Sequence, residues 1–275
     1  MKQSSIKRHR IQCIKVLHYA VDTQKTLLLI AIGVLSISPF QSIAAEQQQV
    51  EQSTQEFGVK LGATRVIYAP NSMGQTLSVS NPQNYPMLVQ SRVYAEDMQS
   101  KAPFVVTPPL FRLDGLQQSN LRIVRTGGTF ANDRESLQWL CVKGIPPKAD
   151  DLWAKDKDGQ PAVKDKISLS LQVSIDNCIK LLIRPESIKG GPEDVASSLA
   201  WSRQGKQLKA MNDTPFYINF DSLKVGMVDI TNINYVPPFS SSTFPFPNGA
   251  SGKVTWSVVT DYGGVSPVYQ AEIKS

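Results

Sequence analysis

The stretch ISLSLQVSIDNCIKLLIRP, residues 167–185, alternates apolar and polar side chains through its first half. Ser or Gln separates each apolar residue from the next in the series Ile167, Leu169, Leu171, Val173 and Ile175. This strict alternation predicts a β-strand with one dry and one wet face, because successive side chains of a strand point in opposite directions. The pattern does not decide whether the dry face covers the protein's own core or is offered to a partner.

Short strand-like runs recur on both sides of this stretch, separated by Pro, Gly and Asn. Their spacing of about ten residues is typical of β-sandwiches. The runs are too numerous for one seven-stranded sandwich, so we expect an all-β chain of two immunoglobulin-like sandwiches, residues 46–185 and 186–275. The expected strands lie within residues 64–70, 76–86, 87–97, 119–128, 135–147, 167–183, 215–220, 252–261 and 267–273.

The first 45 residues have the pattern of a secretory signal peptide. Residues 1–25 carry six basic residues and one acid, residues 26–37 are apolar, and QSIAA follows with small residues. An apolar run of this length is too short to span a bilayer, so we expect export and cleavage after Ala44 or Ala45. An uncleaved anchor is the alternative, because the basic lead is unusually long.

Loss of the leader changes the charge of the molecule. The full chain has 29 Lys and Arg and 23 Asp and Glu, and removal of the leader leaves 23 and 22. Basicity therefore gives no support for a nucleic-acid partner. Both histidines, His9 and His18, also leave. The mature chain is thus expected to lack Ser-His-Asp and Cys-His catalysis and every His metal site.

Two cysteines, Cys141 and Cys178, remain after Cys13 is removed. In an exported chain we expect them to form a disulfide. Between them, residues 148–166 are polar, charged and broken by Gly and Pro, which predicts a long mobile loop.

A calcium site is the alternative for this loop. Asp156, Asp158 and Asp165 fall on three positions of a calcium-loop pattern, but Ala154 takes the first position and Glu is missing from the last. We therefore expect a solvated loop and no metal.

FANDRESLQWLCVKGIPP, residues 130–147, resembles position for position the signature of periplasmic chaperones of the chaperone–usher pathway, the PapD-like family. Residues 103–114, 120–128 and 212–220 look like further family blocks, so the resemblance covers essentially the whole mature chain. The cysteine pair and the long loop resemble the long FG-loop subclass, which serves capsular-antigen and pH 6 antigen or Myf-type fimbriae. The resemblance implies two immunoglobulin-like domains in an L-shaped arrangement.

The resemblance also implies a function, that of a periplasmic chaperone and not an enzyme. Such a chaperone caps fimbrial or capsule-like subunits that lack a final strand, by lending its own, and delivers them to an outer-membrane usher. Main-chain hydrogen bonds and alternate side chains in pockets stabilise such a complex. The residues that match the family's donor strand are Ile167, Leu169, Leu171, Val173 and Ile175.

Two basic residues match the family's invariant pair in the cleft between the domains. Arg65 lies in KLGATRVIY and Lys180 in DNCIKLL. Two neighbouring cations repel each other unless an anion joins them, and a subunit's C-terminal carboxylate would do so. We therefore expect Arg65 and Lys180 to anchor that carboxylate. No cofactor, nucleic acid or membrane insertion is expected.

The residues before Leu61 leave two alternatives open. In the long-loop subclass this extension adds a strand beside the donor strand, and Phe57, Val59 and Leu61 alternate suitably. The Gln-rich residues up to Gln52 fit a frayed tail equally well. Because an exposed donor strand favours aggregation, the free chaperone is expected to cap itself as a homo-oligomer.

Two other function classes were compared with the chaperone. A secreted immunoglobulin-like structural or adhesin module would also be all-β with one disulfide, but such a subunit usually ends after one sandwich. An enzyme without His would need a Ser–Lys pair or paired carboxylates, and no motif for either is present.

Overall fold

The computed structural model describes residues 53–148, 151–154 and 170–274. The predicted signal peptide, donor residues Ile167 and Leu169, and the aspartates of the calcium alternative lie outside these described residues. The described chain is almost entirely β-structure, with one short helix, α1(Pro192–Val195), and two 3-10 turns, η1(Leu152–Ala154) and η2(Ala196–Ser198). No helix among the described residues is long and apolar enough to cross a membrane.

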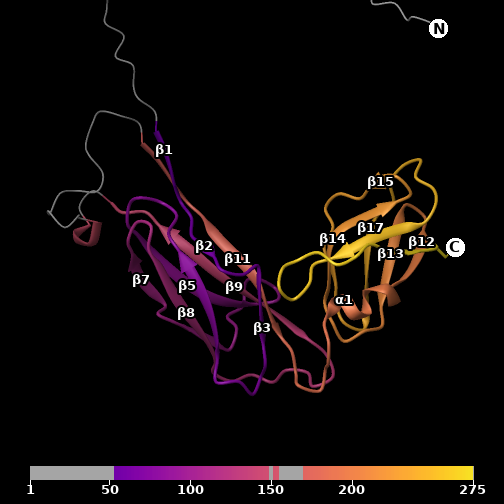
Figure 1. The fold of residues 1–275 in the computed structure, drawn as a ribbon, viewed down its shortest axis with the longest axis horizontal. Helices are drawn as coiled ribbons and strands as arrows, with labels where there is room; N and C mark the ends of the chain where they lie inside the picture. The colour runs from indigo at the N-terminus through magenta and orange to yellow at the C-terminus, as the bar shows by residue number, and fades with distance from the viewer. Residues whose placement is uncertain (1–52, 149–150, 155–169, 275) are drawn as a thin grey trace, which may run out of the picture. The chain divides into compact units, whose positions relative to one another are not determined.

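The first sandwich consists of two sheets around one apolar core (Figure 1). Alternation explains the core, because Met87, Val89 and Val93 of one sheet and Leu121 and Ile123 of the other are all buried between the sheets. The first sheet has the order β3(Arg65–Tyr68), β11(Asp176–Ile183), β9(Ser136–Ile145), β5(Met87–Ala95), β7(Leu110–Leu113). The second has the order β2(Lys60–Leu61), β4(Gln75–Ser80), β8(Gln118–Arg125), β6(Phe104–Thr107).

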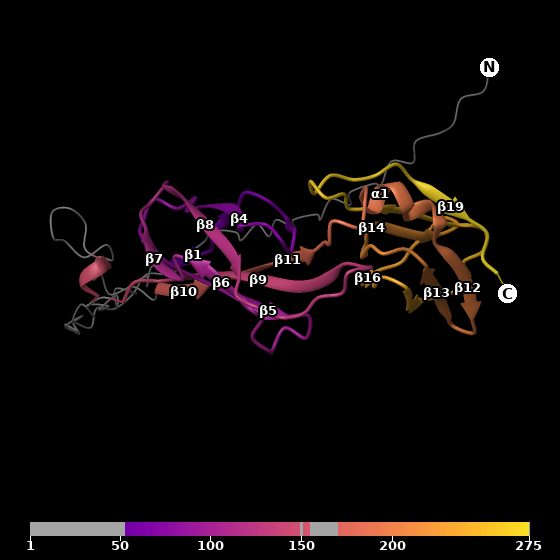
Figure 2. The ribbon, with the colours of Figure 1, turned by 90° about the horizontal axis from the view of Figure 1, so that it is seen from below.

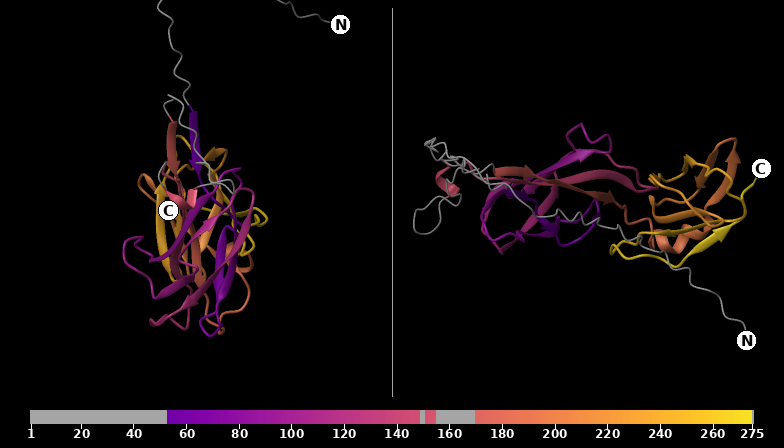
Figure 3. Two further views of the ribbon diagram at one scale, coloured as in Figure 1. Left: turned by 90° about the vertical axis from the view of Figure 1, so that its left-hand side faces the viewer. Right: turned by 90° about the horizontal axis from the view of Figure 1, so that it is seen from above.

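A two-stranded parallel ribbon joins β1(Ser53–Phe57) to β10(Ser170–Ser174) (Figures 2 and 3). The prediction of one continuous strand over 167–183 is therefore wrong, because the strand divides at Ile175. The part after Ile175, β11, lies between β3 and β9 in the main sheet, whereas β10 pairs with β1 instead. Strand β9, which pairs with β11, ends at Ile145, so it does not extend far enough to pair with β10.

Gly144 allows the close contact at this division. A Cβ atom on Gly144 would lie 2.3 Å from the Phe57 carbonyl oxygen, which no side chain tolerates. The backbone of Ile175 makes two hydrogen bonds here, donating to Phe57 (3.1 Å) and accepting from Gly144 (3.2 Å). The ribbon is thus hydrogen-bonded to the sandwich at its base.

The second sandwich is built around two tryptophans, Trp201 and Trp256, whose ring centroids lie 5.1 Å apart. The predicted strands do not include its first sheet, because the apolar signal there is weak: β13 buries Ala210 and Asn212 beside Leu208. That sheet has the order β12(Ala200–Gln204), β13(Gln207–Asn212), β17(Ser240–Pro245). The other sheet has the order β15(Val228–Asp229), β14(Ile218–Val225), β18(Val254–Val258), β19(Tyr269–Ala271), and β16(Tyr235–Val236) also pairs with β14.

A buried asparagine fixes one turn in each sandwich. The side-chain amide of Asn81 donates to the carbonyl oxygens of Tyr85, Leu113 and Asp114. Asn212 repeats the arrangement in the second sandwich, where its amide donates to three carbonyl oxygens. A buried side chain thereby satisfies backbone acceptors that no strand reaches.

Candidate functional site

Strand β10 presents two of the predicted donor side chains to solvent. Leu171 is 52% exposed and Val173 is 38% exposed. Their register partners on β1, Thr54 and Glu56, are exposed as well. In the described part of the chain β10 pairs with β1 alone, so its other edge has no strand beside it. An edge with unpaired backbone groups and apolar side chains is a template for a further strand.

The opposite face of the ribbon is attached to the first sandwich. Phe57 is fully buried and its ring lies 4.9 Å from that of Tyr85. Ser174 donates from its hydroxyl to the carbonyl oxygen of Gly144. Ile175, the last predicted donor residue, belongs by alternation to the face of Leu171 and Val173, but it is half-buried and packs over Gly58. The ribbon is therefore held at its base, and its apolar face is free at Leu171 and Val173.

The predicted disulfide is confirmed. Cys141 on β9 and Cys178 on β11 lie directly opposite each other in the antiparallel pair and are bonded. The bond joins the two strands that lead to and from residues 148–169. It therefore holds the base of the segment that precedes β10.

The two predicted anchor cations are neighbours in the structure. Strands β3 and β11 run parallel, and Arg65 is the register partner of Lys180. Arg65 is 8% exposed and donates through Nη1 to the Val259 carbonyl oxygen at 3.1 Å, while its buried Nε has no partner in the described structure. Neither cation forms an ion pair with a carboxylate of the described residues.

Burial and mutual repulsion act on this pair. Burial, and then the charge of Arg65, lower the pKa of Lys180 below its ordinary value. Burial lowers the pKa of Arg65, although the carboxylates of Asp261, Glu135 and Glu193 partly oppose it. Both groups would gain free energy from an anion bound beside them.

The structure also contains a cluster of ion pairs close to Arg65 and Lys180, which the sequence did not predict. Arg184, which follows β11, forms a two-pronged pair with Asp261 (2.5 and 2.6 Å) and a third bond with Glu135 at 2.7 Å. Glu135 also accepts from the backbone N–H of Tyr217 at 2.8 Å. Burial acts to lower the pKa of Arg184, but the two carboxylates outweigh it and raise that pKa above its ordinary value. The cluster joins residues of both sandwiches, so a local motif could not reveal it.

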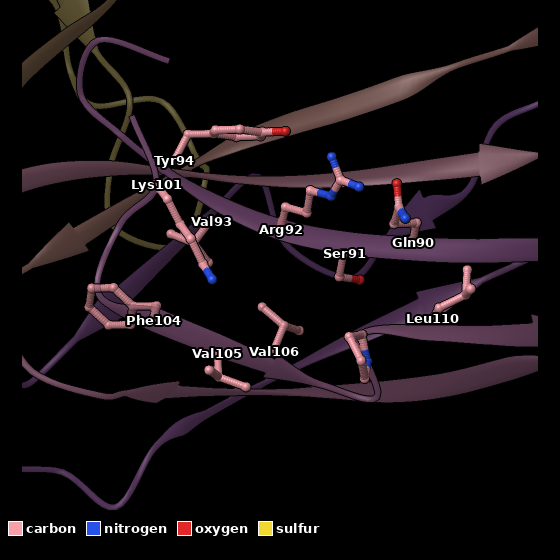
Figure 4. Close-up of a pocket in the computed structure, with 11 residues that line it drawn as sticks. Gln90, Ser91, Arg92, Val93, Tyr94, Lys101, Phe104, Val105, Val106 and Leu110 are labelled. Carbon is pink, nitrogen blue, oxygen red and sulfur yellow. The ribbon is translucent and has the colours of Figure 1, made fainter. Parts of the chain in front are cut away.

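A pocket of about 550 Å³ lies elsewhere on the first sandwich, between β5 and β6 (Figure 4). Val93, Phe104 and Val106 form its apolar walls. Arg92 and Lys101 also line it. None of the predicted site residues lines this pocket, so it is separate from the β10 ribbon and the cation pair.

Comparison with known proteins gives matches over both sandwiches. Residues 58–189 match the family described as pili and flagellar-assembly chaperone, PapD N-terminal domain. Residues 194–270 match the family described as pili assembly chaperone PapD, C-terminal domain. Chaperone protein AggD of Escherichia coli is 50% identical over 244 residues, which cover 88% of this chain and 94% of AggD.

Two solved structures are similar to this chain. The crystal structure of the E. coli chaperone DraB has 54% sequence identity and a TM-score of 0.71, and the match covers 82% of this chain and all of DraB. The SafB chaperone of Salmonella enterica, solved in complex with the SafA pilin, has 50% identity and a TM-score of 0.72. That match covers 81% of this chain and 100% of the SafB chain.

Proposed function

The chain belongs to the PapD-like pili-assembly chaperones, and from this membership we propose that it binds its subunit through β10 and the pair Arg65–Lys180. It is a periplasmic chaperone of the chaperone–usher pathway and not an enzyme. Its clients are fimbrial or capsule-like surface subunits, which chaperones of this family deliver to an outer-membrane usher. Family membership also excludes the alternative of a free structural or adhesin module.

The proposed donor strand is the alternating stretch of residues 167–175, which includes β10. Leu171 and Val173 point away from the chaperone's own core and are partly exposed. A subunit groove that buried the exposed parts of both side chains would contribute about 1–3 kcal/mol before ordering and association costs. Main-chain hydrogen bonds along the unpaired edge of β10 would align the subunit's strand with β10, as in other complexes formed by strand addition.

The proposed anchor is the cation pair. The single observation that carries this proposal is that Arg65 and Lys180 are register neighbours without an ion pair to any carboxylate of the described residues. A subunit's C-terminal carboxylate would relieve their repulsion through charge-assisted hydrogen bonds. It would also set the register, since a slip by one residue turns every apolar side chain to the wrong face.

The separation of the donor strand and the cation pair along the chain predicts the length of the subunit segment that binds to both. Lys180 follows Leu171 by nine positions on the same run of chain. At about 3.3 Å per residue this separation is roughly 30 Å. We therefore expect a bound subunit to contribute an extended C-terminal segment of about nine residues, with its carboxylate at Lys180 and its far end beside Leu171.

Export, the division into two sandwiches and self-association belong to the same proposal. A leader cleaved after Ala44 or Ala45 would export the chain into the periplasm. We also propose that the boundary between the sandwiches lies near Pro185, between the end of β11 and α1. A second copy would pair with the free edge of β10 when no subunit is bound, which gives a self-capping oligomer.

The test is co-expression with the chaperone's cognate fimbrial subunit, followed by pull-down from the periplasm. Lys180→Ala and Arg65→Ala should each leave a folded, exported chaperone that recovers little soluble subunit. Lys253→Ala, which removes an exposed lysine on the second sandwich, is the matched control. Normal recovery with both anchor variants would refute the anchor.

A further inference from the structure

Two aromatic rings lie against the ammonium group of Lys180. Its Nζ is 5.1 Å from the ring centroid of Trp139, the residue directly opposite on β9. It is also 5.4 Å from the ring centroid of Tyr235, which belongs to β16 of the second sandwich. Both distances are within the range of about 6 Å over which a ring face attracts a cation. The two rings therefore flank Lys180 from separate elements.

Glu96 holds both rings. Its carboxylate oxygen Oε1 accepts hydrogen bonds from the hydroxyl groups of Tyr235 (3.1 Å) and Tyr217 (3.2 Å). Its backbone carbonyl accepts from the indole N–H of Trp139 at 3.2 Å. The rings of Tyr217 and Tyr235 also pack edge to face, with centroids 5.4 Å apart. Glu96, the residue that follows β5, thus connects Trp139, Tyr235 and Tyr217.

The tyrosines remain hydrogen-bond donors over the whole physiological pH range. Burial, together with the charge of Glu96, raises the pKa of Tyr235 to about 12. The same causes raise the pKa of Tyr217. The Glu96 carboxylate is consequently occupied by two hydroxyl groups, and it forms no ion pair with Lys180 within the described structure.

Ring faces and a carboxylate would affect Lys180 differently. A carboxylate of the chaperone would neutralise the ammonium group and compete with any incoming anion. Ring faces attract the cation but leave its positive charge and its N–H donors available. They also restrict a flexible four-carbon side chain before the partner arrives, so less ordering remains for the binding step.

We propose that Trp139, Tyr235 and Glu96 are positioning residues that hold the Lys180 ammonium group ready for the subunit's carboxylate. The inference rests on the proposed anchor role of Lys180 and adds the residues through which that role is prepared. Arg65 is the second charged group beside Lys180, and its repulsion is the force that the ring faces must oppose.

The first test needs no subunit. NMR titration of the ¹³C-lysine-labelled mature protein follows the pKa of Lys180 in three variants. Tyr235→Leu removes a ring face that favours the charged form, so the pKa of Lys180 should fall by about 0.5–1 unit. Tyr235→Phe keeps the ring and should leave this pKa near that of the parent protein. Tyr262→Leu, which replaces a fully exposed tyrosine, is the control. An unchanged or raised pKa in Tyr235→Leu would overturn the proposal.

The second test is a double-mutant cycle in which the recovery of soluble cognate subunit is measured. Tyr235→Leu should lower recovery roughly three- to tenfold when Lys180 is present, and should cause no further loss in the Lys180→Ala background. Normal recovery with Lys180→Ala would reject the anchor itself. A defect in Lys180→Ala with normal recovery in Tyr235→Leu would reject only the positioning role. Equal losses in both backgrounds would mean that Tyr235 acts independently of Lys180, and would also overturn it.

Discussion

Truncation of Leu171 to Ala should hardly affect the free chaperone and should strongly weaken its hold on a subunit. Leu171 is 52% exposed, so about half of its side chain is buried by the protein itself. Complete burial of a leucine side chain contributes about 1.5–3 kcal/mol, so the variant should lose only about 1 kcal/mol of unfolding free energy. In a domain pair of this size that corresponds to a fall in Tm of about 2–4 °C.

The same substitution should have a larger effect in the complex. If a subunit groove buries Leu171 completely, its truncation leaves a cavity and should cost about 2–3 kcal/mol of binding free energy. That cost corresponds to a roughly 30- to 160-fold faster loss of subunit. Val173→Ala should behave in the same way, with a smaller effect because the side chain is shorter.

Calorimetry of the free variants and of their purified complexes measures both effects. Leu181→Ala is the matched core control, because Leu181 lies on β11 of the same run and is fully buried. It should cost about 2–5 kcal/mol in the free protein, with Tm falling by roughly 4–20 °C. Gln172→Ala, on the other face of β10, should leave subunit binding nearly unchanged. A large loss of Tm in free Leu171→Ala with normal subunit binding would show that this face belongs to the chaperone's own core.

Two further predictions concern the disulfide and the charge of Lys180. Replacing both Cys141 and Cys178 with Ser should lower the free energy of unfolding by about 3–4 kcal/mol and weaken subunit capture. Calorimetry measures the first effect and pull-down the second, and free thiols in the native mature parent would contradict the disulfide. Because the pKa of Lys180 is lowered on folding, the parent should gain stability as pH rises from that lowered pKa toward the unfolded value near 10.5. Lys180→Met should melt higher at pH 7 and lack this gain, and identical curves of Tm against pH for the two proteins would reject the depressed pKa.

Local pattern was sufficient for much of the fold. Alternation correctly predicted β5 and β8, because each buries apolar residues on the one face of a sheet that covers a core. Strand β9 was also predicted, although its apolar residues lie on both faces, with Leu140 and Val142 in the first core and Leu137 in a separate cluster. It did not predict β12, β13 and β17, where small or polar residues occupy positions facing the core or the strand is short. The division of residues 167–183 at Ile175 was also missed, since it depends on where β9 ends rather than on the run's own residues.

The sequence by itself determined that residues 171, 173 and 175 share one face, that Cys141 and Cys178 could bond, and that the chain resembles one chaperone family. Only the tertiary structure decided that the face with Leu171 and Val173 is exposed while the equivalent alternating face of β5 is buried. It also decided that β10 pairs with β1, and that Glu96, Trp139 and Tyr235 meet around Lys180. Periodicity is a property of neighbours along the chain, whereas burial and side-chain partners depend on strands brought together from distant positions.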